Sequence, residues 1–127
     1  FQSGVPPDYF SSTGQLWGTP TYFWSKHKST NFDWWRKRFK RQFELVDVLR
    51  FDHFRGLAGY WRVNGNSKTA ICGKWINSPG RTLLNKLKND LGKAFPKSFF
   101  SLFNSVLPGE FIHLPQIAVL ELPLTLQ

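Results

Sequence analysis

The sequence predicts an α/β fold, and two observations support this prediction. The chain has 127 residues, of which 41% are hydrophobic and 17% aromatic, so it has the material for one modest domain with a packed core. Apolar residues at helical spacing between residues 30 and 44 run directly into a short, largely apolar segment at 47–52. A helix that leads into a buried strand is half of a βαβ unit, which favours an α/β fold.

Composition and charge exclude several other classes of protein. A single cysteine excludes an internal disulfide framework, and one thiol with three histidines argues against a structural zinc site. No run approaches the roughly 18 apolar residues of a membrane span, and the first residues lack the pattern of a signal peptide. Because the chain starts at Phe1 and contains no methionine, we expect it to be a piece of a longer protein.

Residues 1–21 are rich in Gly, Pro, Ser and Thr and predict a loop. This loop contains four large apolar residues, which are Tyr9, Phe10, Leu16 and Trp17. A loop with large aromatic side chains either packs down as a lid or presents the rings to a ligand.

A first helix is predicted from Thr30 to about Glu44. Its apolar residues recur at spacings of three and four, at Phe32, Trp35, Phe39, Phe43 and Val46. Thr30 and Asp33 have the spacing of a capping box at its start. The basic residues of 36–41 fall mostly between the apolar positions, so they predict the solvated face of this helix. The net charge of +9 leaves nucleic-acid binding as the less favoured alternative.

A buried strand is predicted at 47–52, and a second helix follows later. Alternation along the strand puts Val48, Arg50 and Asp52 on one face and Leu49 and Phe51 on the other. Residues 60–76 predict short strands or loop with a turn at 64–66. The second helix opens at 78–80 and ends at Gly92, with an apolar stripe of Leu83, Leu84, Leu87 and Leu91. In the last third, 111–118 predicts one more buried strand, and 119–126 predicts no element.

Among the eight acidic residues, Asp52 is the candidate for chemistry. It ends the predicted strand on the same face as Arg50, and functional groups of parallel α/β sheets gather where strands end. The cations Arg50 and Arg55 favour a charged carboxylate, which suits a nucleophile or an electrostatic stabiliser. The alternative is a structural ion pair. His53 is equally a hydrogen-bonding neighbour or a catalyst, and Cys72 has no partner nearby in the sequence.

Two long segments, 4–18 (GVPPDYFSSTGQLWG) and 48–56 (VLRFDHFRG), resemble the 4-alpha-glucanotransferase family, whose members are called amylomaltases or disproportionating enzymes. The shorter stretches at 31–35 and 73–76 are also similar, so the resemblance covers about residues 4–93. It implies that residues 1–93 are part of a (β/α)₈ TIM barrel, which is incomplete because a barrel needs roughly 200 residues or more. Residues 94–127 are then a divergent tail.

The resemblance also implies a function and a set of site residues. Family members are retaining enzymes that pass a segment of an α-1,4-glucan to another glucan's 4-hydroxyl, with no metal or organic cofactor. By resemblance, Asp52 matches the nucleophile, Arg50 the residue that orients it, and His53 a substrate contact. The substrate-binding residues implied in the loop are Asp8, Tyr9, Gln15 and Trp17. Hydrophobic packing of Tyr9 and Trp17 is the alternative.

The partners implied are α-1,4-glucans such as maltooligosaccharides, with no nucleic acid and no membrane, in the cytoplasm or, for a plant or alga, the plastid. Retention needs a second carboxyl group about 5–5.5 Å from the first. In the family it lies in an Ile-Ala-Glu-Asp-Leu-Gly motif, but here Ile117-Ala118 is followed by Val119, and Glu121 comes two places late. A reading-frame slip near Val119 is one hypothesis for this departure. We therefore expect the chain alone to be inactive. The rival functions are a non-catalytic glucan-binding module and a basic RNA-binding fragment.

Overall fold

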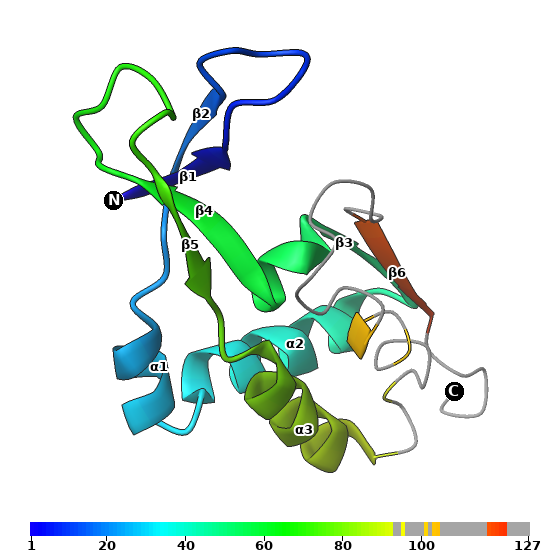
Figure 1. The fold of residues 1–127 in the computed structure, drawn as a ribbon. Helices are drawn as coiled ribbons and strands as arrows, with labels where there is room; N and C mark the ends of the chain where they lie inside the picture. The colour runs from blue at the N-terminus through cyan, green and yellow to red at the C-terminus, as the bar shows by residue number, and fades with distance from the viewer. Residues whose placement is uncertain (93–94, 96–100, 102, 105–116, 122–127) are drawn as a thin grey trace. The chain divides into compact units, whose positions relative to one another are not determined.

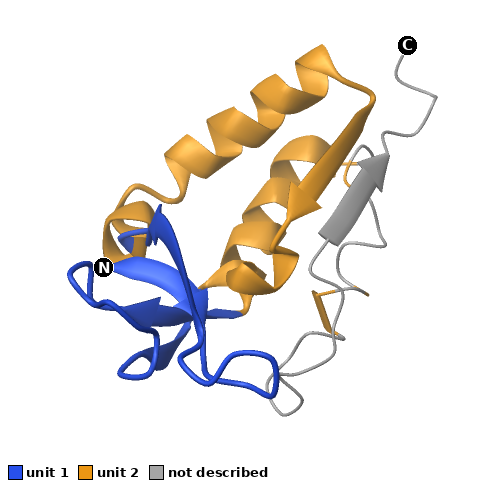
Figure 2. Ribbon diagram, turned by 90° about the horizontal axis from the view of Figure 1, so that it is seen from above, with its two compact units in different colours: residues 1–23, 59–78 blue, residues 24–58, 79–127 orange. Residues whose placement is uncertain are grey.

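The computed structural model describes residues 1–92, 95, 101, 103–104 and 117–121 (Figure 1). The chain forms two compact units, and each is built from two separate stretches of sequence. The first unit contains residues 1–23 and 59–78, and the second contains residues 24–58 and 79–127 (Figure 2). Both helices and strands are present, which confirms an α/β chain.

The first unit is a four-stranded sheet in the order β2-β1-β4-β5, and all its neighbouring strands are antiparallel. Its strands are β1 (Gln2–Val5), β2 (Gln15–Pro20), β4 (Gly59–Val63) and β5 (Lys74–Asn77). Val63 and Ala70 are its most buried apolar residues, at 1% and 0% exposure.

The prediction of a loop over residues 1–21 is therefore wrong at its two ends, because residues 2–5 form β1 and residues 15–20 form β2. These strands were missed because their side chains do not alternate in hydrophobicity and because β1 pairs with β4, about sixty residues away in sequence. Gly4 lies so close to the carbonyl of Gln15 that a side chain at this position would meet it. The turn predicted at 64–66 is confirmed, since the backbone N–H of Ser67 donates to the carbonyl of Asn64 at 3.1 Å.

The second unit contains three helices: α1 (Trp24–Ser29), α2 (Asp33–Leu45) and α3 (Gly80–Leu91). Helices α2 and α3 confirm the two helices predicted from periodicity, and α1 was not predicted. The predicted capping box is wrong. The hydroxyl of Thr30 donates to the carbonyls of Lys26 and His27, so it satisfies the end of α1. Phe32 precedes α2 instead, in a left-handed conformation with φ 57°.

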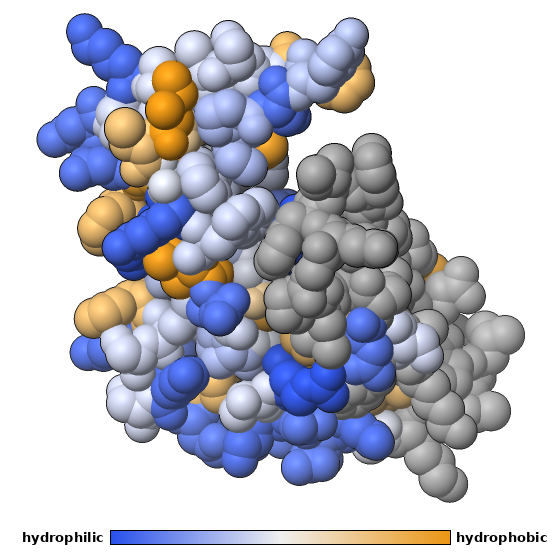
Figure 3. All heavy atoms as spheres, in the orientation of Figure 1, coloured by the Kyte–Doolittle hydropathy of each residue, from blue (hydrophilic) through white to orange (hydrophobic). Residues whose placement is uncertain are grey.

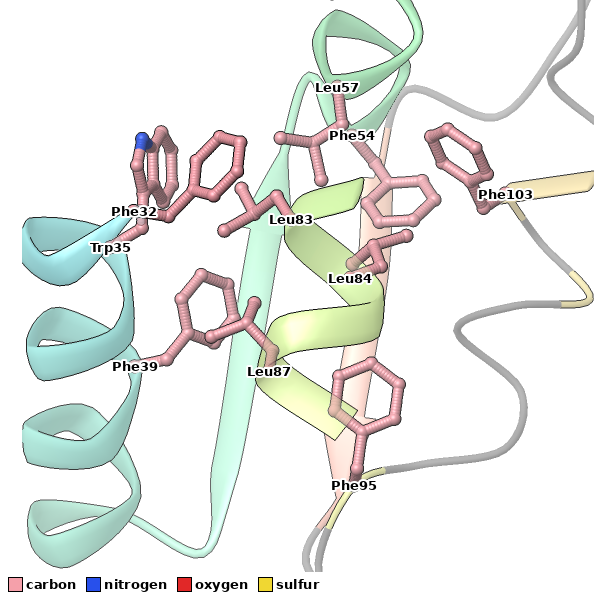
Figure 4. Close-up of a cluster of buried hydrophobic side chains, with 10 residues drawn as sticks. All are labelled: Phe32, Trp35, Phe39, Phe54, Leu57, Leu83, Leu84, Leu87, Phe95 and Phe103. Carbon is pink, nitrogen blue, oxygen red and sulfur yellow. The ribbon is translucent and has the colours of Figure 1, made fainter. Parts of the chain in front are cut away.

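The core of the second unit lies between the apolar faces of α2 and α3 (Figure 4). Phe32, Trp35 and Phe39 from the α2 segment face Leu83, Leu84 and Leu87 of α3. Phe54 and Leu57, from the short 3-10 helix η1 (Phe54–Leu57), close one end. All these residues are at most 3% exposed, so both predicted apolar stripes form a real helix–helix interface.

The basic run of α2 lies on its outer face, as predicted. Lys37 pairs with Asp33 at 2.8 Å and Arg41 pairs with Glu44 at 3.2 Å, and these basic side chains are more than 60% exposed. Across the helices, the guanidinium of Arg36 forms two hydrogen bonds with the carboxylate of Asp90 on α3. In the view of Figure 3, the region over α2 and α3 is largely hydrophilic. This is the ordinary surface of an amphipathic helix pair.

Strand β3 (Val48–Asp52) pairs antiparallel with β6 (Ile117–Glu121). The predicted alternation is confirmed, because Leu49 and Phe51 pack against the core while Arg50 and Asp52 are exposed. The prediction of a fully buried strand is wrong, since Val48 is 53% exposed.

Strand β6 includes residues 119–121, where no element was predicted; residues 111–116 of the predicted last strand lie outside the described residues. No parallel strand pair occurs in the described part of the chain. Nor does any helix within these residues have the length and hydropathy to cross a membrane.

Candidate active site

The end of β3 carries a charged pair. The guanidinium Nε of Arg50 donates to Oδ1 of Asp52 at 2.8 Å, and the two side chains are 63% and 70% exposed. Their side chains share one face because they are two residues apart on a strand, with Phe51 packed into the core between them. A carboxylate that is oriented by a cation and open to solvent is suited to attack an electrophilic carbon.

His53 changes the direction of the chain directly after Asp52. Its backbone is left-handed, with φ 49° and ψ 42°, and its carbonyl accepts a hydrogen bond from the N–H of Gly56 at 2.8 Å, which starts η1. The next residue, Phe54, is fully buried between Phe51 and Phe103, in edge-to-face contact with both rings. This sharp turn is anchored in the core on both sides of His53, and such strained positions are common at functional sites.

The electrostatics of the turn favour a neutral imidazole at His53. Burial lowers the pKa of His53, and the positive charge of Arg55 lowers it further. Burial also lowers the pKa of Arg55. The charge of Arg55, which was predicted to flank Asp52, therefore acts on His53 as well. A neutral histidine has one ring nitrogen that donates and one that accepts a hydrogen bond, and both ring nitrogens of His53 are buried.

The loop between β1 and β2 presents two aromatic rings to solvent. Tyr9 is 99% exposed and Phe10 is 91% exposed, and their rings meet edge-to-face with centroids 5.7 Å apart. The alternative that Tyr9 packs into a core is therefore wrong. Asp8 shapes the loop, because its Oδ1 accepts hydrogen bonds from the backbone N–H groups of Phe10 and Ser11.

The other two predicted loop residues lie on β2 and contact each other. The indole Nε1–H of Trp17 donates to Oε1 of Gln15 at 3.2 Å. Trp17 is half-buried and Gln15 is exposed, so Gln15 has the more open side chain. The predicted site residues thus form two groups. Asp8, Tyr9, Gln15 and Trp17 belong to the first unit, and Arg50, Asp52 and His53 belong to the second.

The register of β3 and β6 shows where Glu121 lies relative to Asp52. Asp52 pairs with Ile117, whereas Glu121 pairs with Val48 at the other end of the ladder. Four residues at about 3.3 Å each separate them by roughly 13 Å along the strand. This spacing is much longer than the distance between the two carboxyl groups of a retaining glycosidase, about 5–5.5 Å. The register therefore puts Glu121 and Asp52 at opposite ends of the strand pair.

Two further residues lie beside the predicted site residues. Phe10 belongs to the predicted aromatic loop and is exposed beside Tyr9, which fits the alternative that this loop presents its rings to a ligand. Gly56, for which the sequence indicated no separate role, lies directly against the ring of His53. In the described residues, no group of three His, Cys, Asp or Glu side chains is placed to hold a metal ion.

Sequence comparison defines the class of protein to which this pair of motifs belongs. The profile of the 4-alpha-glucanotransferase family matches residues 1–98, which include both groups of site residues. The chain belongs to the 4-alpha-glucanotransferase family.

Individual relatives agree with this assignment. A 4-alpha-glucanotransferase of Aquifex aeolicus is 48% identical over 100 residues, 79% of this chain and 20% of that protein. One from Clostridium butyricum is 52% identical over 90 residues, 71% of this chain and 18% of that protein. A chloroplastic/amyloplastic 4-alpha-glucanotransferase of Solanum tuberosum is 48% identical over 91 residues, 72% of this chain and 16% of that protein. The chain thus spans a fifth or less of the length of these relatives.

A solved structure is similar as well. The amylomaltase from Streptococcus agalactiae in complex with acarbose superposes with a TM-score of 0.68 at 45% sequence identity. The match covers 72% of this chain and 18% of that one.

Proposed function

We propose that this chain is part of the catalytic domain of a 4-alpha-glucanotransferase, which transfers a segment of an α-1,4-glucan to the 4-hydroxyl of an acceptor glucan or glucose. The observation that carries the proposal is the Arg50-oriented carboxylate of Asp52, exposed at the end of β3 within the segment that the family profile matches. The complex of the S. agalactiae relative with acarbose supports a sugar ligand.

In the proposed reaction, Asp52 is the nucleophile. Its carboxylate attacks the anomeric carbon of the donor, the bond from that carbon to the leaving 4-oxygen breaks, and a protonated carboxyl group gives its proton to the leaving oxygen. The acceptor's 4-hydroxyl then attacks the same carbon, its proton goes to the acid group, and Asp52 is released. Two displacements at one carbon retain its configuration. Arg50 holds the attacking carboxylate in place, and the acid group comes from outside the described residues.

The remaining predicted residues are proposed to bind the glucan. Exposed rings such as those of Tyr9 and Phe10 stack on the apolar faces of sugars. The amide of Gln15 can donate hydrogen bonds to hydroxyl groups and accept them, whereas the carboxylate of Asp8 accepts them. His53, with its pKa lowered, is proposed to bind a hydroxyl as a neutral imidazole. Trp17 is proposed to support Gln15 through the 3.2 Å hydrogen bond between their side chains.

We further propose that residues 1–93 are a section of a (β/α)₈ barrel and that residues 94–127 are a divergent tail. The first part is supported by the likeness to the S. agalactiae amylomaltase, and the second by the end of the family match at residue 98. The compartment proposed is the cytoplasm or, in a plant or alga, the plastid. The plastid alternative is supported by the chloroplastic/amyloplastic relative from S. tuberosum.

Replacing Asp52 by Asn tests the proposal in the longest protein that contains this chain. Transfer between maltotriose molecules should fall by roughly four orders of magnitude or more, because the variant lacks the nucleophile. Asp47→Asn is the matched control, since Asp47 is an exposed acid just before the same strand, and it should leave transfer unchanged. Full activity of Asp52→Asn would refute the proposed nucleophile. The 127-residue chain should show no transfer by itself, because the acid-bearing motif of the family is lost at Val119.

Glucan binding without catalysis is a second candidate function. It needs no second carboxyl group, and the exposure of Tyr9 and Phe10 favours it. The same variant distinguishes the two functions. A binding module should retain both its glucan affinity and its biological function as Asp52→Asn, whereas a transferase should retain affinity and lose turnover.

A further inference from the structure

Gly56 lies so close to the ring of His53 that any side chain at position 56 would require the ring to shift. A Cβ atom built on Gly56 would lie 2.7 Å from Cδ2 and 3.2 Å from Nε2 of His53. The three nearest heavy atoms to that position all belong to the imidazole ring. A side chain at position 56 would therefore push on the ring of His53 before it met any other group.

The backbone of the turn brings His53 and Gly56 together. The left-handed backbone of His53 and the hydrogen bond from the N–H of Gly56 to its carbonyl bring the two residues together. Phe54 is fully buried and fixes the next position of the chain. Gly56 has a negative φ, so an alanine could adopt its backbone conformation, and glycine is needed here for space and not for backbone freedom.

We propose that Gly56 is a positioning residue for the transfer reaction, because the bare backbone of Gly56 is the surface on which the imidazole of His53 rests when it contacts the glucan. This proposal rests on the proposed function for the role of His53 and on the geometry of the turn for the role of Gly56. A methyl group at position 56 displaces the ring while Arg50, Asp52 and the core stay in place.

The first test measures the ring itself in the 127-residue chain by NMR, independently of activity. His53→Ala assigns the His53 ring signals. Gly56→Ala should shift those signals and raise the titration midpoint of His53, since burial is what chiefly lowers its pKa. Gly65→Ala is the matched control, because Gly65 is a glycine without positive φ whose nearest heavy atom is 4.0 Å away, and it should change neither. Unchanged His53 signals in Gly56→Ala would overturn the proposal.

The second test is a double-mutant cycle on maltotriose transfer in the longest protein that contains this chain. Gly56→Ala should lower kcat/KM on the order of 10- to 100-fold with His53 present, and add little once His53 is replaced by Ala. Equal losses in both backgrounds would indicate a purely structural glycine and overturn the proposal. If Gly56→Ala does not fold, the double variant should fold again, because the clashing ring is gone; failure of both would also overturn it. If the proposed function is wrong, Asp52→Asn will keep full activity, and the NMR result will be unaffected.

Discussion

Phe54 joins the candidate site to the core, and its replacement by leucine should destabilise the second unit measurably. Phe54 follows His53 directly and is 0% exposed. Its ring is in edge-to-face contact with Phe51 at 6.0 Å and with Phe103 at 6.3 Å, with interplanar angles of 88° and 86°. Leucine retains an apolar side chain but makes neither aromatic contact.

The magnitude follows from these contacts. Each aromatic pair contributes about 0.5–1.5 kcal/mol beyond the apolar area that it buries. The smaller leucine also leaves unfilled volume, which costs roughly 24 cal/mol per Å³ in well-packed cores. The two pairs alone account for about 1–3 kcal/mol, and the unfilled volume adds to this. Phe54→Leu should therefore lower the free energy of unfolding by at least about 1–3 kcal/mol.

Urea unfolding followed by tryptophan fluorescence and far-UV circular dichroism measures this change. The midpoint should move to lower urea with an unchanged slope, which indicates a change in stability alone. Phe23→Leu is the control, because Phe23 is 73% exposed and its replacement should stay within about 0.5 kcal/mol of the parent. Equal midpoints for Phe54→Leu and the parent chain would refute the packing described for η1.

Two further predictions follow from the charged and the aromatic surfaces. The hydrogen bond from Arg36 lowers the pKa of Asp90. The charged carboxylate therefore stabilises the folded state at pH values above the ordinary aspartate pKa, which is about 4. This contribution is lost as the pH falls through the lower pKa of the folded state. Asp90→Asn should therefore be less stable than the parent at pH 7, and in thermal unfolding the difference should shrink as the pH falls below about 4. A difference independent of pH would contradict this account. Tyr9→Ala should weaken maltoheptaose binding in calorimetry while the free energy of unfolding changes by less than about 0.5 kcal/mol, because the ring is 99% exposed. Unchanged affinity would show that the loop between β1 and β2 does not bind the glucan through Tyr9.

The helices could be predicted because their signals are local. Each apolar stripe of α2 and α3 lies within one stretch of sequence, and its residues meet in the core as their spacing indicates. Strands β1 and β2 could not be predicted in this way. Their pairing depends on backbone hydrogen bonds with β4, far along the chain, and their side chains do not alternate in hydrophobicity. Thr30 shows the same limit on a smaller scale, since its hydroxyl serves the preceding helix α1.

Within the candidate site, the pairing of Arg50 with Asp52 could be predicted because two residues on one strand face share a side. The role of Arg55 could not be predicted. Its charge acts on the imidazole of His53, whose left-handed backbone sets the geometry of the turn. The contact of Gly56 with that ring also depends on the turn, and no residue spacing indicates a left-handed histidine.

The alternation of β3 puts residues for stability on one face of the strand and residues for the proposed reaction on the other, and mutations can distinguish the two. Leu49 and Phe51 pack against the core, Arg50 and Asp52 face solvent, and the turn at His53 leads to the buried Phe54. Changes at the solvent-facing positions should affect turnover, because an exposed ion pair contributes at most about 1 kcal/mol to stability. Changes at the inward positions should first affect stability, and turnover only through displacement of the turn. Because both kinds of residue alternate along a single strand, the same packing that stabilises the unit also fixes where the proposed nucleophile points.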